Sequence, residues 1–222
     1  FIMDDVLMEI INLKLLKTLR INCEGISMKC FSLISNMDLQ ELHLESKRKS
    51  HWFLPLMTTL KFESVKKLSL NLPYMELPLE KLHSMLQGKL QELSIATPQS
   101  LALQGIFSSK ASEFLETVSL EITKSNRSSM SQLIKGFNRY FHNMKSFKII
   151  NKNSMIAGQT RELVTVISKF PQLKQLYVEG FKLSEVLHCA ILKAAKNLEE
   201  LTLLNYSKDL DYVIPASSKR AI

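Results

Sequence analysis

Histidine and cysteine often carry metal-binding or nucleophilic chemistry, and this sequence of 222 residues has five of the first and three of the second. The histidines form no H-x-x-x-H or H-E-x-x-H spacing, and no C-x-x-C pair occurs. Zinc sites use such spacings because their ligands must converge on one ion. A glycine-rich phosphate loop and a G-x-S-x-G element are also absent from the sequence. We therefore predict no catalytic residue, no metal site and no cofactor, and we expect the chain not to be an enzyme.

A recurring apolar frame is the strongest pattern in the chain. Residues Phe170–Gly180 contain Leu173-x-x-Leu176-x-Val178, and the same spacing starts at positions 16, 39, 65, 90, 115, 144, 173 and 198. The eight copies are 23 to 29 residues apart, with a mean step of 26. A period in this range indicates a solenoid, in which each repeat stacks on its neighbours. The alternative is a set of scattered core strands in an ordinary α/β domain, and the regularity of the frame favours the solenoid.

Each copy of the frame predicts a short strand with frame positions 1, 4 and 6 in the core. We expect an α/β solenoid whose eight inner strands pair in parallel, with helices or irregular arcs outside. Residues 1–222 then form a single domain, with an N-terminal cap or preceding helix over 1–15, eight repeats over 16–204 and a C-terminal cap or tail over 205–222. Apolar residues at helical spacing recur in four outer segments. These segments are Gln99–Phe114, Ser128–Phe141, Thr160–Phe170 and Leu183–Lys196.

The residues that could bind a partner lie between the core positions of the strands. Frame positions 3, 5 and 7 point away from the core and form the concave face of the predicted solenoid. Tyr177, Ile150 and Leu204 gather at its C-terminal end, and exposed apolar residues on a polar face are typical of binding hot spots. The alternative for Ile150 and Leu204 is that they turn inward and only pack. The polar candidates on the same face are Glu179, Glu200, Glu121, Lys148 and His43.

The distribution of charge bears on the class of partner. The chain carries a net charge of +8, which invites a nucleic-acid hypothesis. The predicted concave face instead carries six Glu against three Lys or Arg, whereas a phosphate-binding surface needs the opposite balance. Ser69, Ser94 and Ser119 occupy the same position in three consecutive repeats, and their small side chains would form a flat surface on which a partner could lie. We expect a protein partner with a basic segment, and an RNA-binding or nuclear-export module stays as the alternative.

The frame resembles the L-x-x-L-x-L signature of leucine-rich repeats. Residues 23–27, C-E-G-I-S, also resemble the C-x-x-I-[ST] turn of cysteine-containing leucine-rich repeats, with the cysteine one place early. The mean step of 26 over about residues 13 to 204 resembles the irregular repeats of F-box receptors, and the repeats of nucleotide-binding innate immune receptors look similar. The first resemblance implies a substrate receptor of a ubiquitin ligase, and the second implies ligand sensing or autoinhibition.

Four further features concern the setting of the domain. Leu77–Leu86 resembles the opening of an F-box, but it falls on the repeat step, so we expect an outer helix there. No run of about 18 apolar residues occurs, so no membrane span is expected. Extracellular leucine-rich repeats resemble one another in having paired cap cysteines, whereas three unrelated cysteines indicate a reduced, cytoplasmic or nuclear setting. Because the chain does not begin with Met, we expect a neighbouring domain in a longer polypeptide.

Overall fold

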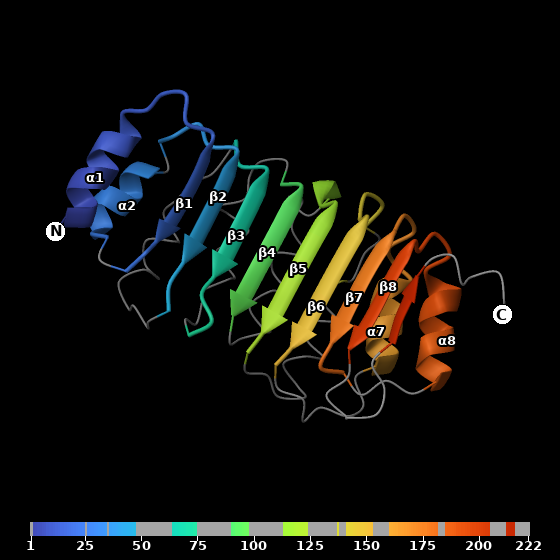
Figure 1. Cartoon of the computed structure of the whole chain (residues 1–222). Helices are drawn as coiled ribbons and strands as arrows, with labels where there is room; N and C mark the ends of the chain where they lie inside the picture. Colours follow the sequence, from blue (N-terminus) through green and yellow to red (C-terminus); the bar gives the residue numbers. More distant parts are fainter. Residues whose placement is uncertain are drawn as a thin grey trace.

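The computed structural model describes residues 2–24, 26–34, 36–47, 64–74, 90–97, 113–123, 137, 141–152, 160–181, 185–204 and 212–215. Its nine strands form one sheet in chain order, as a continuous row from β1 at one end to β9 at the other (Figure 1). The strands are β1 (Thr18–Asn22), β2 (Glu41–Glu45), β3 (Lys67–Asn71), β4 (Glu92–Thr97), β5 (Thr117–Ile122), β6 (Ser146–Asn151), β7 (Gln175–Glu179), β8 (Glu200–Leu204) and β9 (Tyr212–Pro215).

The eight strands that carry the apolar frame pair in parallel, which confirms the predicted solenoid of parallel strands. Each pair keeps the frame in register. Leu19 lies opposite Leu42 at one end, and Leu93 lies opposite Val118 in the middle of the sheet. The unequal steps between copies, from 23 to 29 residues, are therefore absorbed between the strands and not within them.

Backbone hydrogen bonds repeat along the solenoid just before the strands. The carbonyl of Lys17, at frame position 2, accepts two N–H groups of the next repeat, from Gln40 at 2.8 Å and from Glu41 at 3.0 Å. The same double contact recurs in every repeat up to the carbonyl of Lys174, which accepts from Glu199 and Glu200. Because each repeat is bonded at the same frame position to the next one, a slip of one residue would break the whole series.

The core follows the frame and extends one position beyond it. Every frame residue at positions 1, 4 and 6 is buried except Leu16, which is partly buried against the same core. Position 8 forms a further buried column, which the sequence interpretation did not include. Its polar members are Ser46, Thr97 and Asn151, and Cys23 is also buried there. Position 8 continues the alternation of positions 4 and 6, so its side chain lies on the core side of the sheet whether it is polar or apolar, as in the burial patterns of β4 and β5.

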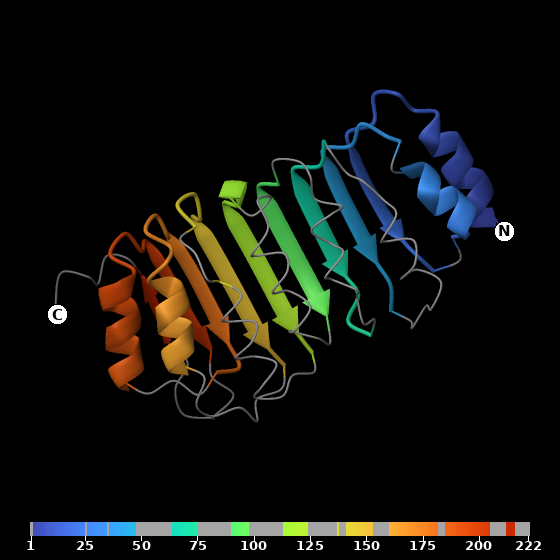
Figure 2. The ribbon, with the colours of Figure 1, turned by 180° about the vertical axis from the view of Figure 1, so that it is seen from behind.

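Four helices are described in this structure. They are α1 (Ile2–Ile11), α2 (Met28–Ile34), α7 (Thr160–Ile167) and α8 (Glu185–Ala194). The last two confirm helices within the predicted outer segments. They lie behind the sheet in Figure 1 and in front of it in the reversed view of Figure 2, so both cover the same face. Leu163 of α7 and Ile191 of α8 are buried in the core that this face shares with the strands.

An aromatic cluster fills the layers beneath β6 and β7. Phe141 and Phe170 precede these strands, and both are buried. They pack with Phe137 and Phe147, and the ring centroids of the contacting pairs are 5.1–5.8 Å apart. Aromatic pairs favour such tilted and edge-to-face arrangements. These two phenylalanines therefore close the hydrophobic layer from which the next strand starts.

The end of the described chain differs from the rest of the sheet. β9 pairs with β8 in the antiparallel direction, with Leu201 opposite Ile214, so part of the expected C-terminal cap or tail forms a reversed terminal strand. Leu77–Leu86 lies outside the described residues, as do most of Gln99–Phe114 and Ser128–Phe141. Within the described parts of the chain, no helix is both long and apolar enough to cross a bilayer.

Candidate binding face

One face of the sheet is left uncovered by α7 and α8. We call the residues at frame positions 3, 5 and 7 of β1–β8 the open face, because they alternate with the core residues that face the helices. These are the residues expected on the concave face. In most strands they are half-buried or exposed, as in the pattern of β1. In-register pairing aligns each frame position into a row that crosses the sheet.

Tyr177 lies at the centre of the C-terminal part of the open face. Its hydroxyl donates a 2.6 Å hydrogen bond to Oε2 of Glu179, two residues along β7. The Nζ of Lys148, opposite Tyr177 on β6, lies 4.6 Å from the centroid of its ring. An ammonium group at this distance from a tyrosine ring is attracted by the ring quadrupole. We call Lys148, Ile150, Tyr177 and Glu179 the Tyr177 cluster.

Ile150 and Glu179 are neighbours in the position-7 row, two residues along their strands from Lys148 and Tyr177. Ile150 lies between Glu121 and Glu179 in register and is only 6% exposed, so it packs within the face and offers little area to a partner. Glu179 also approaches Lys152, with 3.7 Å between Oε1 and Nζ, and its side chain is 16% exposed. The Glu179 carboxylate is therefore held from two sides by groups of this chain.

The remaining C-terminal candidates border the Tyr177 cluster. Leu204 lies opposite Glu179 on β8 and is half-buried. Glu200 is exposed at the start of β8, where its Oε2 accepts a 3.1 Å hydrogen bond from Nε2 of Gln175. Glu121 is half-buried at the end of β5. The structure thus brings together all the predicted binding residues except His43, which lies on β2.

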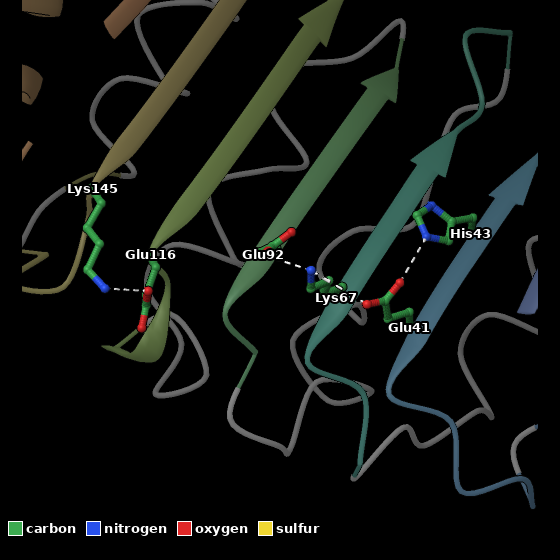
Figure 3. A network of polar contacts seen from close by, with 6 residues as sticks. All are labelled: Glu41, His43, Lys67, Glu92, Glu116 and Lys145. Carbon is green, nitrogen blue, oxygen red and sulfur yellow. Dashed lines mark hydrogen bonds and ion pairs between the residues drawn. The ribbon is translucent and has the colours of Figure 1, made fainter. Parts of the chain in front are cut away.

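A chain of charged side chains occupies the N-terminal part of the open face (Figure 3). Lys67 of β3 lies between two glutamates, with Nζ 3.5 Å from Oε1 of Glu41 and 3.1 Å from Oε1 of Glu92. The hydrogen bond to Glu92 is the main reason why the pKa of Lys67 is raised, and the charges of Glu92 and Glu41 add to it. Two of the six predicted glutamates are therefore compensated by one lysine.

His43 faces a different environment from the Tyr177 cluster. Its Nε2 is 4.0 Å from Oε2 of Glu41, and the pKa of the imidazole is lowered, first by burial and then by the charge of Arg20. Beside it the open face is hollowed over β1–β3, and this hollow has a volume of about 300 Å³. Neighbours of His43 in the hollow include Arg20 and Glu45.

The three serines expected to form a flat surface lie in register on β3, β4 and β5. Ser69 is opposite Ser94, and Ser94 is opposite Ser119. In the position-5 row they lie between His43 on β2 and Lys148 on β6. The position-5 row therefore has three small polar side chains between His43 and the Tyr177 cluster.

Lysines at frame position 2 follow the edge where the strands begin, and several of them have acidic partners. Nζ of Lys145 is 2.7 Å from Oε2 of Glu116 (Figure 3), and Nζ of Lys174 is 2.7 Å from Oε1 of Glu199. Lys17 pairs in the same way with Asp38, and its hydrogen bond is the main reason why the pKa of Asp38 is lowered. Much of the positive charge on this edge is therefore neutralised.

The described thiols differ in their surroundings. Burial raises the pKa of Cys23 to about 12, which keeps this thiol protonated and unreactive at neutral pH. Cys189 on α8 is exposed. No group of three or more His, Cys, Asp or Glu residues in the described ranges is placed to hold a metal ion.

Comparison with protein-family models finds no match to this sequence. Comparison with curated proteins finds none either.

Proposed function

We propose that this chain is a leucine-rich repeat domain that binds a protein partner through its open face. The repeat class is supported by the apolar frame, which every parallel strand pair keeps in register. The binding role is supported by one observation above all, the Tyr177 cluster. It combines an aromatic ring, a cation and a carboxylate on an otherwise polar sheet face, which is the anatomy of an interface hot spot.

The cluster is suited to binding because its groups are ordered before a partner arrives. The hydroxyl of Tyr177 is held by Glu179, and its ring is covered on one side by Lys148. A side chain that is already in one rotamer loses less conformational entropy on association. Half-buried Leu204, opposite Glu179, adds apolar area on the next strand, while Ile150 is buried. Glu121 and Glu200 border the cluster and favour a basic segment in the partner.

The charge arrangement favours a protein over a nucleic acid. Lys67 on the open face is engaged by two glutamates, and Lys145 and Lys174 on the strand-start edge are engaged by acidic partners. A polyanion gains affinity by replacing its counterions with free cationic groups, and these lysines already have carboxylate partners. The RNA-binding or nuclear-export alternative predicts affinity that falls steeply with salt, whereas capture of a protein on Tyr177 does not.

The resemblance to F-box receptors supports a more specific role, that of the substrate-recognition domain of a ubiquitin ligase in the cytoplasm or nucleus. The ligand-sensing or autoinhibitory domain of a nucleotide-binding innate immune receptor is the alternative. The adjoining part of the full polypeptide distinguishes the two. An F-box that binds its ligase adaptor supports the first role, and a nucleotide-binding domain supports the second.

The experiment is a selection of binding peptides from a random library on the immobilised chain, followed by affinity measurements on variants. We expect Tyr177→Ala to weaken binding by about 30-fold or more, since truncating a central aromatic often costs about 2 kcal/mol. Tyr177→Phe separates the ring from the hydroxyl that contacts Glu179. Lys47→Ala, on an exposed loop, is the matched control and should leave the affinity unchanged. Loss of binding in Lys47→Ala with none in Tyr177→Ala, together with a steep salt dependence, would favour the RNA alternative.

A further inference from the structure

The hollow over β1–β3 is a second candidate site on the open face. Its volume of about 300 Å³ is at the lower end of the range of small-molecule sites, roughly 300–1,000 Å³. Its polar lining comes from frame positions 5 and 7 of three neighbouring strands, and it is separated from the Tyr177 cluster by β4 and β5. The polar residues of the lining are Arg20, Asn22, His43, Glu45, Ser69 and Asn71, and Ile21 and Leu44 complete it. A ligand of this hollow therefore need not involve the proposed protein partner.

Two opposite charges line the hollow without pairing. Arg20 lies opposite His43, and Asn22 lies opposite Glu45, so Arg20 and Glu45 are diagonal neighbours on adjacent strands. The backbones of such neighbours are about 7–8 Å apart. Neither Arg20 nor Glu45 forms a side-chain ion pair with any residue that the structure describes. The Arg20 guanidinium and the Glu45 carboxylate therefore lie on adjacent strands, and each can still form hydrogen bonds to a ligand.

Neutral polar groups complete the lining. Oδ1 of Asn22 accepts a 2.9 Å hydrogen bond from the backbone N–H of Glu24, which leaves its Nδ2 group as a donor. Nε2 of His43 has no hydrogen-bond partner among the described atoms. Ser69 and Asn71 add a hydroxyl and an amide from β3. These groups can bond to polar atoms of a ligand that are not charged.

The presence of both Arg20 and Glu45 disfavours ligands that carry only one charge and ligands that carry none. A simple anion would meet Glu45, a simple cation would meet Arg20, and an apolar ligand would desolvate both charges without replacing their hydrogen bonds. A carboxylate can accept two N–H groups from a guanidinium, and an ammonium group can donate to a carboxylate. We propose that this hollow binds a free α-amino acid, with its carboxylate at Arg20 and its ammonium group at Glu45. The amide and hydroxyl groups of Asn22, Ser69 and Asn71 favour an amino acid with a polar side chain.

The test is a series of NMR titrations of the isotope-labelled full chain with each of the twenty free L-amino acids at millimolar concentration. We expect saturable shifts of backbone amide resonances in β1–β3 with at least one polar amino acid. Its N-acetylated form, which lacks the ammonium charge, and its methyl ester, which lacks the carboxylate, should each bind at least about tenfold more weakly. Because these derivatives test the two charges from the ligand side, the proposal stays testable even if a protein variant fails to fold.

Variants test the same two charges from the protein side. Arg20→Gln and Glu45→Gln should each weaken binding at least about tenfold. Lys66→Gln is the matched control, since Lys66 is exposed just before β3 and does not line the hollow. The proposal is overturned if no amino acid shifts resonances in β1–β3, if the N-acetylated form binds as well as the free one, or if folded Arg20→Gln and Glu45→Gln proteins bind like the wild type.

Discussion

Leu93 and Glu92 are neighbours in β4 whose side chains lie on opposite faces of the sheet. Leu93 is 1% exposed in the core, whereas the Glu92 side chain is 46% exposed and paired with Lys67. Leu93→Ala should lower the free energy of unfolding by about 2–5 kcal/mol, because it leaves a cavity between two packed layers. Glu92→Ala should lower it by about 1 kcal/mol or less, the usual range for an exposed ion pair. Chemical denaturation of both variants measures the difference, and equal losses would contradict the assignment of faces.

His43 gives the open face a dependence of stability on pH. The groups around it are Arg20, Glu41 and Lys67, and burial and the two cations together outweigh Glu41, so the pKa of the folded state lies below the ordinary value of 6.5. As the pH falls below 6.5, the unfolded chain takes up a proton before the folded chain does. The folded state then loses relative stability until the pH reaches the lowered pKa.

A variant that removes this titration should flatten the pH profile. As the pH is lowered from 7 towards the folded-state pKa of His43, the melting temperature of the wild type should fall. His43→Asn should show a smaller fall in the same buffers. Thermal unfolding followed by circular dichroism is the measurement. An unchanged profile would mean that His43 titrates alike in the folded and unfolded chain.

At the scale of elements, the aromatic cluster couples β6, β7 and the segment that precedes each. Phe170 contacts Phe137, Phe141 and Phe147, with ring centroids 5.8, 5.7 and 5.1 Å from its own. Phe170→Ala should lower the free energy of unfolding by about 3–5 kcal/mol, because three rings lose a shared neighbour. Tyr74→Ala is the control, since Tyr74 is 51% exposed, and it should change stability little. A similar loss in both variants would argue against a packed aromatic layer.

The strands could be predicted from the sequence because one physical signal repeats in them. Three apolar residues at fixed spacing mark each strand, and stacking in register follows from their common role in the core. The buried column at frame position 8 could not be predicted in this way, because Cys23, Ser46 and Asn151 share no residue type. β9 could not be predicted either, because Tyr212–Pro215 does not contain the apolar frame that marks the other strands.

The candidate binding face could be predicted as a set of residues but not as a set of contacts. Alternation along a strand places Tyr177 and Lys148 on the same face, and register makes them neighbours. The approach of the Lys148 ammonium to the Tyr177 ring, and of Lys152 to Glu179, depends on side-chain conformations that alternation does not specify. The burial of Ile150 has the same origin, because alternation assigns it to the open face while its neighbours cover it.

At the scale of the whole molecule, the sheet is a one-dimensional stack in which each strand pairs only with the next. In such a stack, stability is approximately a sum of repeats and of interfaces between neighbours, so a change at one end stays local. β9 protects the outer edge of β8, and its Ile214 lies opposite Leu201. Removal of residues 205–222 should therefore speed amide hydrogen exchange in β8 and then β7, while exchange in β2–β4 stays unchanged.

The matched control for this deletion removes only residues 216–222, which leaves β9 in place, and it should leave exchange in β8 as in the full chain. Hydrogen exchange read residue by residue distinguishes local from global effects, because each amide reports the opening of its own strand. Equal acceleration in β2–β4 and β8 would mean that the repeats open together as one cooperative unit. The terminal strand would then stabilise the whole solenoid and not only the repeat it covers.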